Sequence, residues 1–468
     1  MSRRLIMILA LAFVVGLACA AYAEVQNVKV SGDLTVYGIS RKMWTSPTQN
    51  NRESAMASVT RVRIDADLTD NVMATVRLLN ERYWGNETGN AGGGSNTKNS
   101  DIDLDLAYVT MKEFMYSPLT LMIGRQELHF GNDMIVGDPD TNNAVTTASP
   151  FSGVSSAWPR DPDLSARKAF DAIRATLNYD PLIIDLVAAE VRKTTLNIDN
   201  AENLYGINAS YAVNKKNNVE GYWFERRIGR KNSPSTWNNK IDTTHNIGAR
   251  IVSRQIENLI YQLEVAFQFG TSVVDNIAPP WTGSTQRRRA LAVETAATYD
   301  LKNVKSIAKY SPTVTMLYAY FSGNRGSGEK TNRAWSPMYE NQKFGDITNL
   351  LFPQSNAHVL GGIASVKPVE DVTLKGEYYA YWWDKVFSNG QVLSPGSVLT
   401  SDTLTMTNKK FAGQEIDLTA TYAYTEDVQF SLMGGIMIPG ASFKNIASSD
   451  NGSRSNASEV IGSMKVTF

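Results

Sequence analysis

The ten residues from 59 to 68 read Val59-Thr60-Arg61-Val62-Arg63-Ile64-Asp65-Ala66-Asp67-Leu68, and from Arg61 on they alternate between charged and apolar side chains. Successive side chains of a β-strand point to opposite faces of the sheet, so the apolar members share one face and the charged members share the other. An α-helix would mix the two sets, because its faces repeat every 3.6 residues. This stretch therefore predicts a strand with one apolar and one charged face.

The same alternation recurs along the chain and predicts about 18 strands. The predicted strands are residues 28–38, 59–68, 72–84, 101–111, 119–130, 170–179, 182–193, 204–213, 219–228, 245–254, 259–269, 288–301, 314–321, 357–366, 372–383, 411–424, 428–438 and 459–468. Strands that face lipid on one side and water on the other are typical of bacterial outer-membrane barrels, which have even strand numbers of this size. We therefore predict an all-β fold, a transmembrane antiparallel β-barrel.

The connections between these strands alternate in length. Short ones, such as 69–71, 116–118 and 179–181, carry turn-forming residues. The long ones are rich in Gly, Asn and Ser and comprise residues 85–100, 131–167, 229–242, 272–286, 323–355, 387–409 and 440–456. Outer-membrane barrels have short periplasmic turns and long extracellular loops. The alternation thus favours a barrel over a soluble sandwich and places both termini on the periplasmic side.

The N-terminus has the pattern of an export signal. Arg3 and Arg4 precede a long apolar run that ends in Ala21-Tyr22-Ala23. We predict a cleaved signal peptide at residues 1–23 and a single outer-membrane barrel domain at 24–468, with an uncleaved anchor as the alternative. Cleavage would leave 46 − 2 = 44 basic residues against 46 acidic ones.

Composition excludes several other classes of protein. The balance of basic and acidic residues argues against a nucleic-acid partner. Cys19, the one cysteine, lies in the signal region, where lipidation is an alternative interpretation. The three histidines, His129, His245 and His358, lack the local spacing of metal sites. We predict no metal, no cofactor and no catalytic residues, and therefore no enzyme; a Gly-x-Ser-x-Gly nucleophile motif is also missing from the sequence.

Four short segments, in order along the chain, resemble the alginate export family of outer-membrane channels. They are residues 121–131, which include Gly124-Arg125-Gln126, and residues 167–174, 413–418 and 438–440. The resemblance implies an 18-stranded monomeric barrel whose lumen is narrowed by loops and lined by arginines that guide an anionic polysaccharide. Arg125 and Arg174 match the arginines of the family's motifs. The terminal strand ending in Phe468 also resembles the signal by which the barrel assembly machinery recognises its clients.

Fixed charges at the narrowest part of a pore decide its selectivity, because confined water screens them weakly. The predicted pore-lining and substrate-guiding residues are Arg61, Arg63, Arg77, Arg125, Arg174, Arg250, Asp65, Asp67, Glu415 and Asp417. The alternative role is wall packing, in which the arginines pair with carboxylates of neighbouring strands. Further inward charges are predicted at Asp101, Asp103, Asp105, Asp185, Glu264, Glu294, Glu377, Arg288, Lys375 and Lys465. This mixture departs from a lining of arginines alone.

Two features leave alternatives open. Strict alternation puts Arg125 on the lipid face, where it should lie at the outer rim unless a bulge at Gly124 turns it inward. The loop 131–167 is the longest connection and holds five aspartates: Asp133, Asp138, Asp140, Asp161 and Asp163. We expect it to fold into the lumen as a constriction; an outward cap, or a divalent-cation site on its aspartates, are the alternatives.

The sequence therefore predicts an outer-membrane channel that passes hydrophilic, anionic solutes or polysaccharide by passive diffusion. Its expected partners are outer-membrane lipid, the barrel assembly machinery and an anionic polysaccharide or small hydrophilic solute. The alternatives are a nonspecific general porin and a structural or surface-interaction barrel with an occluded lumen.

Overall fold

A computed structural model gives the architecture of the chain. It describes residues 27–42, 52–85, 102–141, 162–193, 201–229, 232–233, 236–237, 241–274, 284–324, 330–389, 392–393, 404–445 and 456–468. The predicted signal peptide at 1–23 and the central part of loop 131–167 lie outside these ranges.

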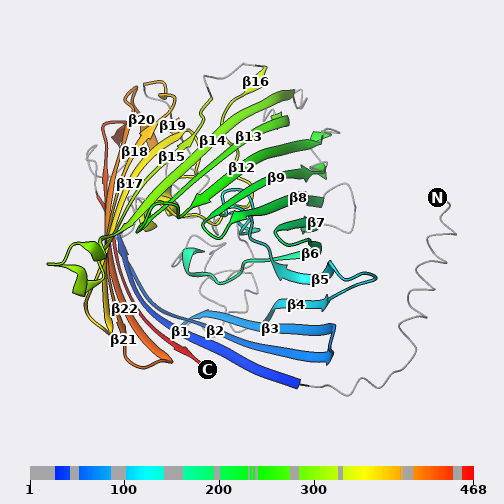
Figure 1. Ribbon diagram of the computed structural model, residues 1–468. Coiled ribbons are helices and arrows are strands. Elements are labelled where there is room, and N and C mark those ends of the chain that lie inside the picture. The colour runs from blue at the N-terminus through cyan, green and yellow to red at the C-terminus, as the bar shows by residue number, and fades with distance from the viewer. Residues whose placement is uncertain are drawn as a thin grey trace.

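Eighteen long strands form one closed antiparallel barrel (Figure 1). They are β1 (Asn27–Lys42), β2 (Arg52–Thr69), β3 (Val72–Tyr83), β4 (Asp103–Met111), β5 (Leu119–Glu127), β6 (Ala169–Asn178), β7 (Leu182–Lys193), β8 (Ala201–Asn214), β9 (Asn217–Ile228), β12 (Asp242–Ser253), β13 (Leu259–Val274), β14 (Ser284–Asp300), β15 (Thr313–Phe321), β17 (Ala357–Val369), β18 (Val372–Trp383), β21 (Phe411–Ala423), β22 (Val428–Pro439) and β24 (Ala457–Thr467). Each overlaps one predicted strand. The predicted fold class and strand number are confirmed.

Short elements occupy the connections. They are β10 (Asn232–Ser233), β11 (Thr236–Trp237), β16 (Thr331–Asn332), β19 (Val392–Leu393), β20 (Leu404–Met406), β23 (Phe443–Asn445), the 3-10 turns η2 (Pro162–Leu164), η4 (Leu301–Asn303) and η5 (Ala308–Tyr310), and the helix α2 (Asp346–Leu351). Within the described ranges, no helix combines the length and apolar character that a membrane span requires.

The barrel closes where the first strand meets the last. β1 pairs with β24 from Asp33 opposite Thr467 to Lys42 opposite Ser458. The amide of Gly32 donates to the carbonyl oxygen of Phe468 at 2.8 Å, and the amide of Phe468 donates back at 3.0 Å. A Cβ at position 32 would lie 2.6 Å from Cζ of Phe468, so glycine leaves room for the terminal ring. The C-terminal residue is thereby part of the seam.

The two faces of the wall divide as the alternation predicts. Large apolar side chains are exposed on the outer face, among them Ile64, Ile173, Ile247 and Leu418. The charged residues between them, such as Arg63 and Arg174, face the lumen. Outward apolar side chains are stable because hydrocarbon surrounds the barrel there, whereas inward ones would meet water unless something covers them. The interior therefore depends on what the loops place inside it.

Candidate functional site: the lumen and its plug

Two segments far apart in sequence fold into the barrel and interlock; we call residues 130–141 and 330–356 together the plug. Val136 bridges Tyr339 in parallel register. The amide of Gly137 donates to the Tyr339 carbonyl at 2.7 Å, and the Tyr339 amide donates to the Ile135 carbonyl at 3.1 Å. The Gln342 side chain donates to the carbonyl of Asn132 at 2.6 Å. These hydrogen bonds join the two segments into one unit.

Apolar contacts attach the plug to the inner wall. Phe130, on the plug, packs against Phe224 of β9 with ring centroids 5.2 Å apart. Tyr339 meets Phe170 of β6 edge to face at 5.7 Å. Ile347 of α2 is fully buried in the same cluster. Burying a large apolar side chain stabilises by about 1.5 to 3 kcal/mol, so several such contacts hold the plug firmly.

Carboxylates of the wall anchor the backbone of the plug. Glu264 accepts from the Asn132 amide at 2.9 Å, and Glu294 accepts from the Asn132 side chain at 2.6 Å. On another part of the wall, Glu415 of β21 accepts from the amides of Ile347 and Thr348, each at 2.8 Å. These acids face inward as predicted, but their partners are protein groups.

Glu415 and Asp417 therefore do not line open lumen. Both face inward, yet they are only 0% and 1% exposed because α2 packs over them. Their assignment to the accessible pore lining is wrong for a physical reason that alternation cannot reveal. Period two gives the face of a strand but not what a distant loop lays upon it.

Five of the six arginines predicted to line the pore face the lumen, and each lies beside a carboxylate. Arg61 pairs with Asp33 at 2.8 Å, Arg63 with Asp65 at 2.8 Å, Arg77 with Asp105 at 2.6 Å, Arg174 with Asp185 at 2.8 Å and Arg250 with Glu220 at 3.6 Å. The wall pairing that the sequence left as an alternative is thus present. Asp65 takes part in it, and Asp67 also falls on the lumen face of β2, by the register of that strand.

The cation is the more accessible member in most of these lumenal pairs. Side-chain exposure is 24% against 16% for Arg61 and Asp33, 36% against 20% for Arg63 and Asp65, and 25% against 6% for Arg174 and Asp185. The same order holds for Lys168–Asp138, Arg192–Glu202, Arg250–Glu220 and Lys375–Glu377. It is reversed in Arg77–Glu127, Arg167–Asp103 and Arg288–Asp242. The inward carboxylates are numerous, but many are more buried than the cations with which they pair.

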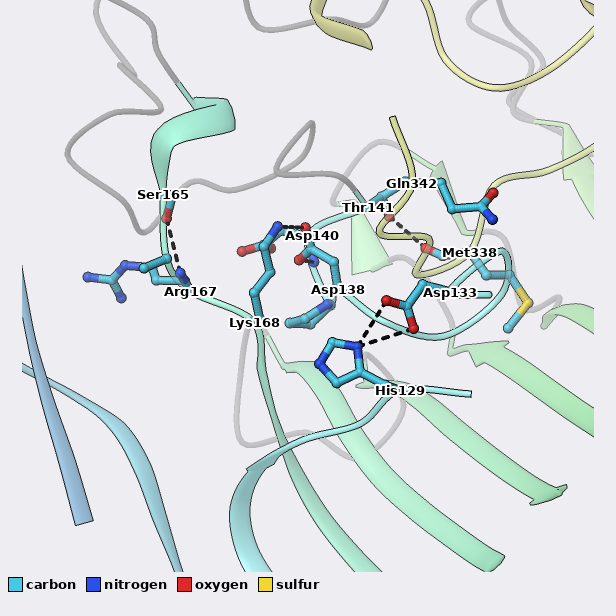
Figure 2. Close-up of polar contacts among 12 residues, drawn as sticks. His129, Asp133, Asp138, Asp140, Thr141, Ser165, Arg167, Lys168, Met338 and Gln342 are labelled. Carbon is cyan, nitrogen blue, oxygen red and sulfur yellow. Dashed lines mark hydrogen bonds and ion pairs between the residues drawn. The ribbon is translucent and has the colours of Figure 1, made fainter. Parts of the chain in front are cut away.

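The described aspartates of loop 131–167 each bond a different basic side chain. Figure 2 shows His129 directed at Asp133 and Lys168 at Asp138. Asp140 pairs with Arg192, and Asp163 pairs with the buried Arg41 of β1 at 2.6 Å. Each of these aspartates is thus engaged by a basic group of the wall or of the loop itself. Within the described ranges, no three potential metal ligands gather, and Asp161 lies outside those ranges.

The plug region contains two groups that can carry a positive charge, His129 and Lys343. The hydrogen bond that the His129 ring donates to Asp133 raises the pKa of His129 above its usual value, despite partial burial. The pKa of Lys343, on the plug, is raised, because attraction by Asp346 and Asp163 outweighs the opposing effect of desolvation. The Lys343 side chain is 44% exposed. By contrast, burial raises the pKa of Asp138, although Lys168 opposes the shift. Sequence reasoning missed Lys343, because nothing in its loop signals an inward path.

Arg125 is not among the lumen-facing residues. The β4–β5 register runs without a shift past Gly124, so no bulge turns the side chain inward. Arg125 stands opposite Asp171 of β6 and pairs with it at 3.3 Å on the outer side of the wall. Its assignment to the pore is wrong, and strict alternation gave the correct face.

Gly124 and Gln126, the neighbours of Arg125, shape the end of the strand. Gly124 has φ +126°, and a Cβ there would lie 2.1 Å from the Ala107 carbonyl oxygen. The Gln126 amide donates to the Ala172 carbonyl of β6 at 3.1 Å. The glycine allows β4 and β5 to approach closely, and the Gln126 hydrogen bond joins β5 to β6.

The comparison with known families supports this architecture. Residues 42–457 match the alginate export family model. The chain belongs to the alginate export family. This family forms outer-membrane channels, so the protein is a channel-forming barrel of the bacterial outer membrane and not an enzyme.

Solved outer-membrane channels share the fold at low sequence identity. Pseudomonas aeruginosa OccK3 (OpdO) aligns with TM-score 0.55 and 10% identity over 96% of this chain and 97% of its own. Acinetobacter baumannii OccAB1 gives 0.55 and 10% over 96% and 99%. OccAB4 of the same organism gives 0.56 and 10% over 95% and 99%. No curated protein matches the sequence significantly.

Proposed function

We propose that this alginate export family member passes hydrophilic anionic solutes, or an anionic polysaccharide, through its lumen by passive diffusion. The observation that carries the proposal is the unequal exposure within the lumenal ion pairs. Arg61, Arg63 and Arg174 present more surface to the lumen than the aspartates that bind them. A passing carboxylate meets guanidinium groups, which can donate to it while they remain paired.

The plug supplies the constriction in this proposal. It carries Lys343, and Lys168 lies at its edge, so cations from the loops are added to those of the wall; His129, also at the edge, adds a charge when it is protonated. Charges in a narrow, poorly hydrated passage act more strongly than charges in bulk water. In this proposal, the described residues 131–141 of the predicted constriction loop narrow the lumen together with residues 330–356, which the sequence did not single out.

Reversal potentials in planar bilayers under a salt gradient test the proposal. We expect the wild-type channel to prefer anions, and the double variant Arg61→Ala/Arg174→Ala to reduce the anion-to-cation permeability ratio about threefold, as two lumenal charges are lost. Arg125→Ala is the matched control: it removes an arginine of the same family motifs from the outer face and should leave the ratio unchanged.

Other results would contradict the proposal. Conductance without charge preference would indicate a nonspecific porin. A barrel that inserts but does not conduct would indicate an occluded surface protein. An equal effect of Arg125→Ala and Arg174→Ala would show that selectivity does not depend on the lumenal face.

A further inference from the structure

The outer face of the barrel carries a row of polar side chains near the long-loop rim. Register places Arg125, Asp171, Glu190, Asn203, Arg227, Thr243, Thr271 and Arg287 directly beside one another across successive strands. Alternation puts these side chains outward, level with the ends of the strands. The row marks the height at which the wall stops being apolar.

The two halves of this row differ in charge. In the first half Arg125 is bound by Asp171, and Glu190 stands next to Asp171. In the second half, on β9 to β14, Arg227 and Arg287 are exposed and have no carboxylate partner among the described residues. Arg289, two residues below Arg287 on the same face, is likewise exposed. Within this row, the arginines without a carboxylate partner thus lie in one sector. Glu225, two residues from Arg227 on the same face, lies 4.0 Å from His245 and offsets part of their charge.

The apolar wall continues directly below this basic sector. His245 and Phe269 lie in the row of Arg289 and stack with ring centroids 4.9 Å apart. The next outward-facing row toward the membrane centre contains Ile247, Phe267 and Leu291, which are 54%, 41% and 37% exposed. β9, β12, β13 and β14 lie side by side along this sector (Figure 1). Cationic groups therefore stand above a hydrocarbon-facing surface.

The spacing suits a single large headgroup. Neighbouring strands are about 4.8 Å apart, so Arg227 and Arg287, three strands apart, are separated by roughly 14 Å at the backbone. Their long side chains can converge over Thr243 and Thr271. Guanidinium groups bind phosphate oxygens in two-pronged hydrogen bonds, so a phosphorylated headgroup suits this cluster.

We propose that Arg227, Arg287 and Arg289 form a site for a phosphorylated lipid of the outer leaflet. The phosphate groups are held by the three arginines, and the acyl chains lie on Ile247, Phe267 and Leu291. An amphiphile fits because the site is amphiphilic in the same order, charged at the rim and apolar toward the membrane centre. The half of the row with Asp171 and Glu190 would repel such a headgroup.

The test measures binding of a bisphosphorylated glycolipid to the purified protein in neutral-lipid nanodiscs. The triple variant Arg227→Ala/Arg287→Ala/Arg289→Ala should bind it about tenfold or more weakly, since each basic residue near an anionic surface contributes to attraction. The control Lys215→Ala/Lys216→Ala/Arg254→Ala removes three exposed charges at the opposite ends of the same strands and should bind normally. Heat-modifiable gel mobility verifies that both variants are folded.

Three results would overturn the assignment. Equal binding of the dephosphorylated glycolipid would exclude phosphate recognition. Equal loss in the control variant would show a general charge effect. Equally tight binding of inorganic phosphate in detergent would show an anion site to which the lipid chains add nothing. The measurement does not involve conductance, so its outcome is independent of the transport proposal.

Discussion

The two arginines that match the family's motifs lie on opposite sides of the barrel wall. Arg125 of β5 faces outward and binds Asp171 at 3.3 Å; Arg174 of β6 faces inward and binds Asp185 at 2.8 Å. Asp171 and Arg174 are three residues apart on one strand, an odd spacing that puts them on opposite faces. A motif identifies a relative, but only the face of the strand says what its arginine can touch.

The surroundings of the two pairs explain their different roles. Arg125 and Asp171 are near the rim, where an outward charge can reach water and headgroups at little cost. Arg174 lies deeper, beside the plug, where its guanidinium is 5.3 Å from the Phe130 ring centroid. A charge at that depth is tolerated only because it faces the aqueous lumen. The comparison therefore separates a rim contact from a lumenal one.

The largest expected effect comes from an arginine placed on the lipid-facing side of the wall at the depth of Arg174. Ile173 is adjacent to Arg174 and is 51% exposed on the outer face. Ile173→Arg should destabilise the barrel by about 2 to 4 kcal/mol, because the guanidinium must enter hydrocarbon. Urea unfolding from lipid vesicles measures the change. The control Thr120→Arg, on the lumen face of β5, should change stability by no more than about 0.5 kcal/mol, and a similar cost for both would refute the assignment of the faces.

Removal of the aspartates sharpens the comparison. Asp185→Asn leaves Arg174 without its counter-charge and should raise the anion-to-cation permeability ratio about twofold. Asp171→Asn removes the counter-charge of Arg125. It should leave the permeability ratio unaltered, because the field of Arg125 acts outside the pore. Reversal potentials under a salt gradient distinguish the two variants. A shift from Asp171→Asn as large as that from Asp185→Asn would contradict our view.

The smallest expected effect is a dependence on pH at the edge of the plug. Since the pKa of His129 is raised, the ring gains its positive charge as pH falls through a value above its ordinary one of about 6.5. Anion preference should therefore rise, by less than about twofold, between pH 8 and pH 6. His129→Gln should flatten this dependence, and Arg125→Ala should preserve it. A preference that falls on acidification would exclude His129 as a lumenal cation.

Much of the fold follows from local chemistry. Each barrel strand was predictable because a wall between hydrocarbon and water forces alternation on every strand it contains. The same rule located Arg61, Arg63, Arg77, Arg174 and Arg250 on the lumen face and gave the correct face for Arg125. Where the family motif was preferred to the alternation, at Arg125, the prediction was wrong.

The tertiary structure alone decided which inward charges remain accessible. Glu415 and Asp417 obey the alternation, but α2, from a loop of no regular pattern, covers them. Lys343 enters the lumen on the same loop without any signal in its sequence. Alternation is a property of neighbours in one strand, set by the solvents on either side of it. The plug depends on contacts between residues about 200 positions apart, such as Val136 with Tyr339, and no local pattern records them.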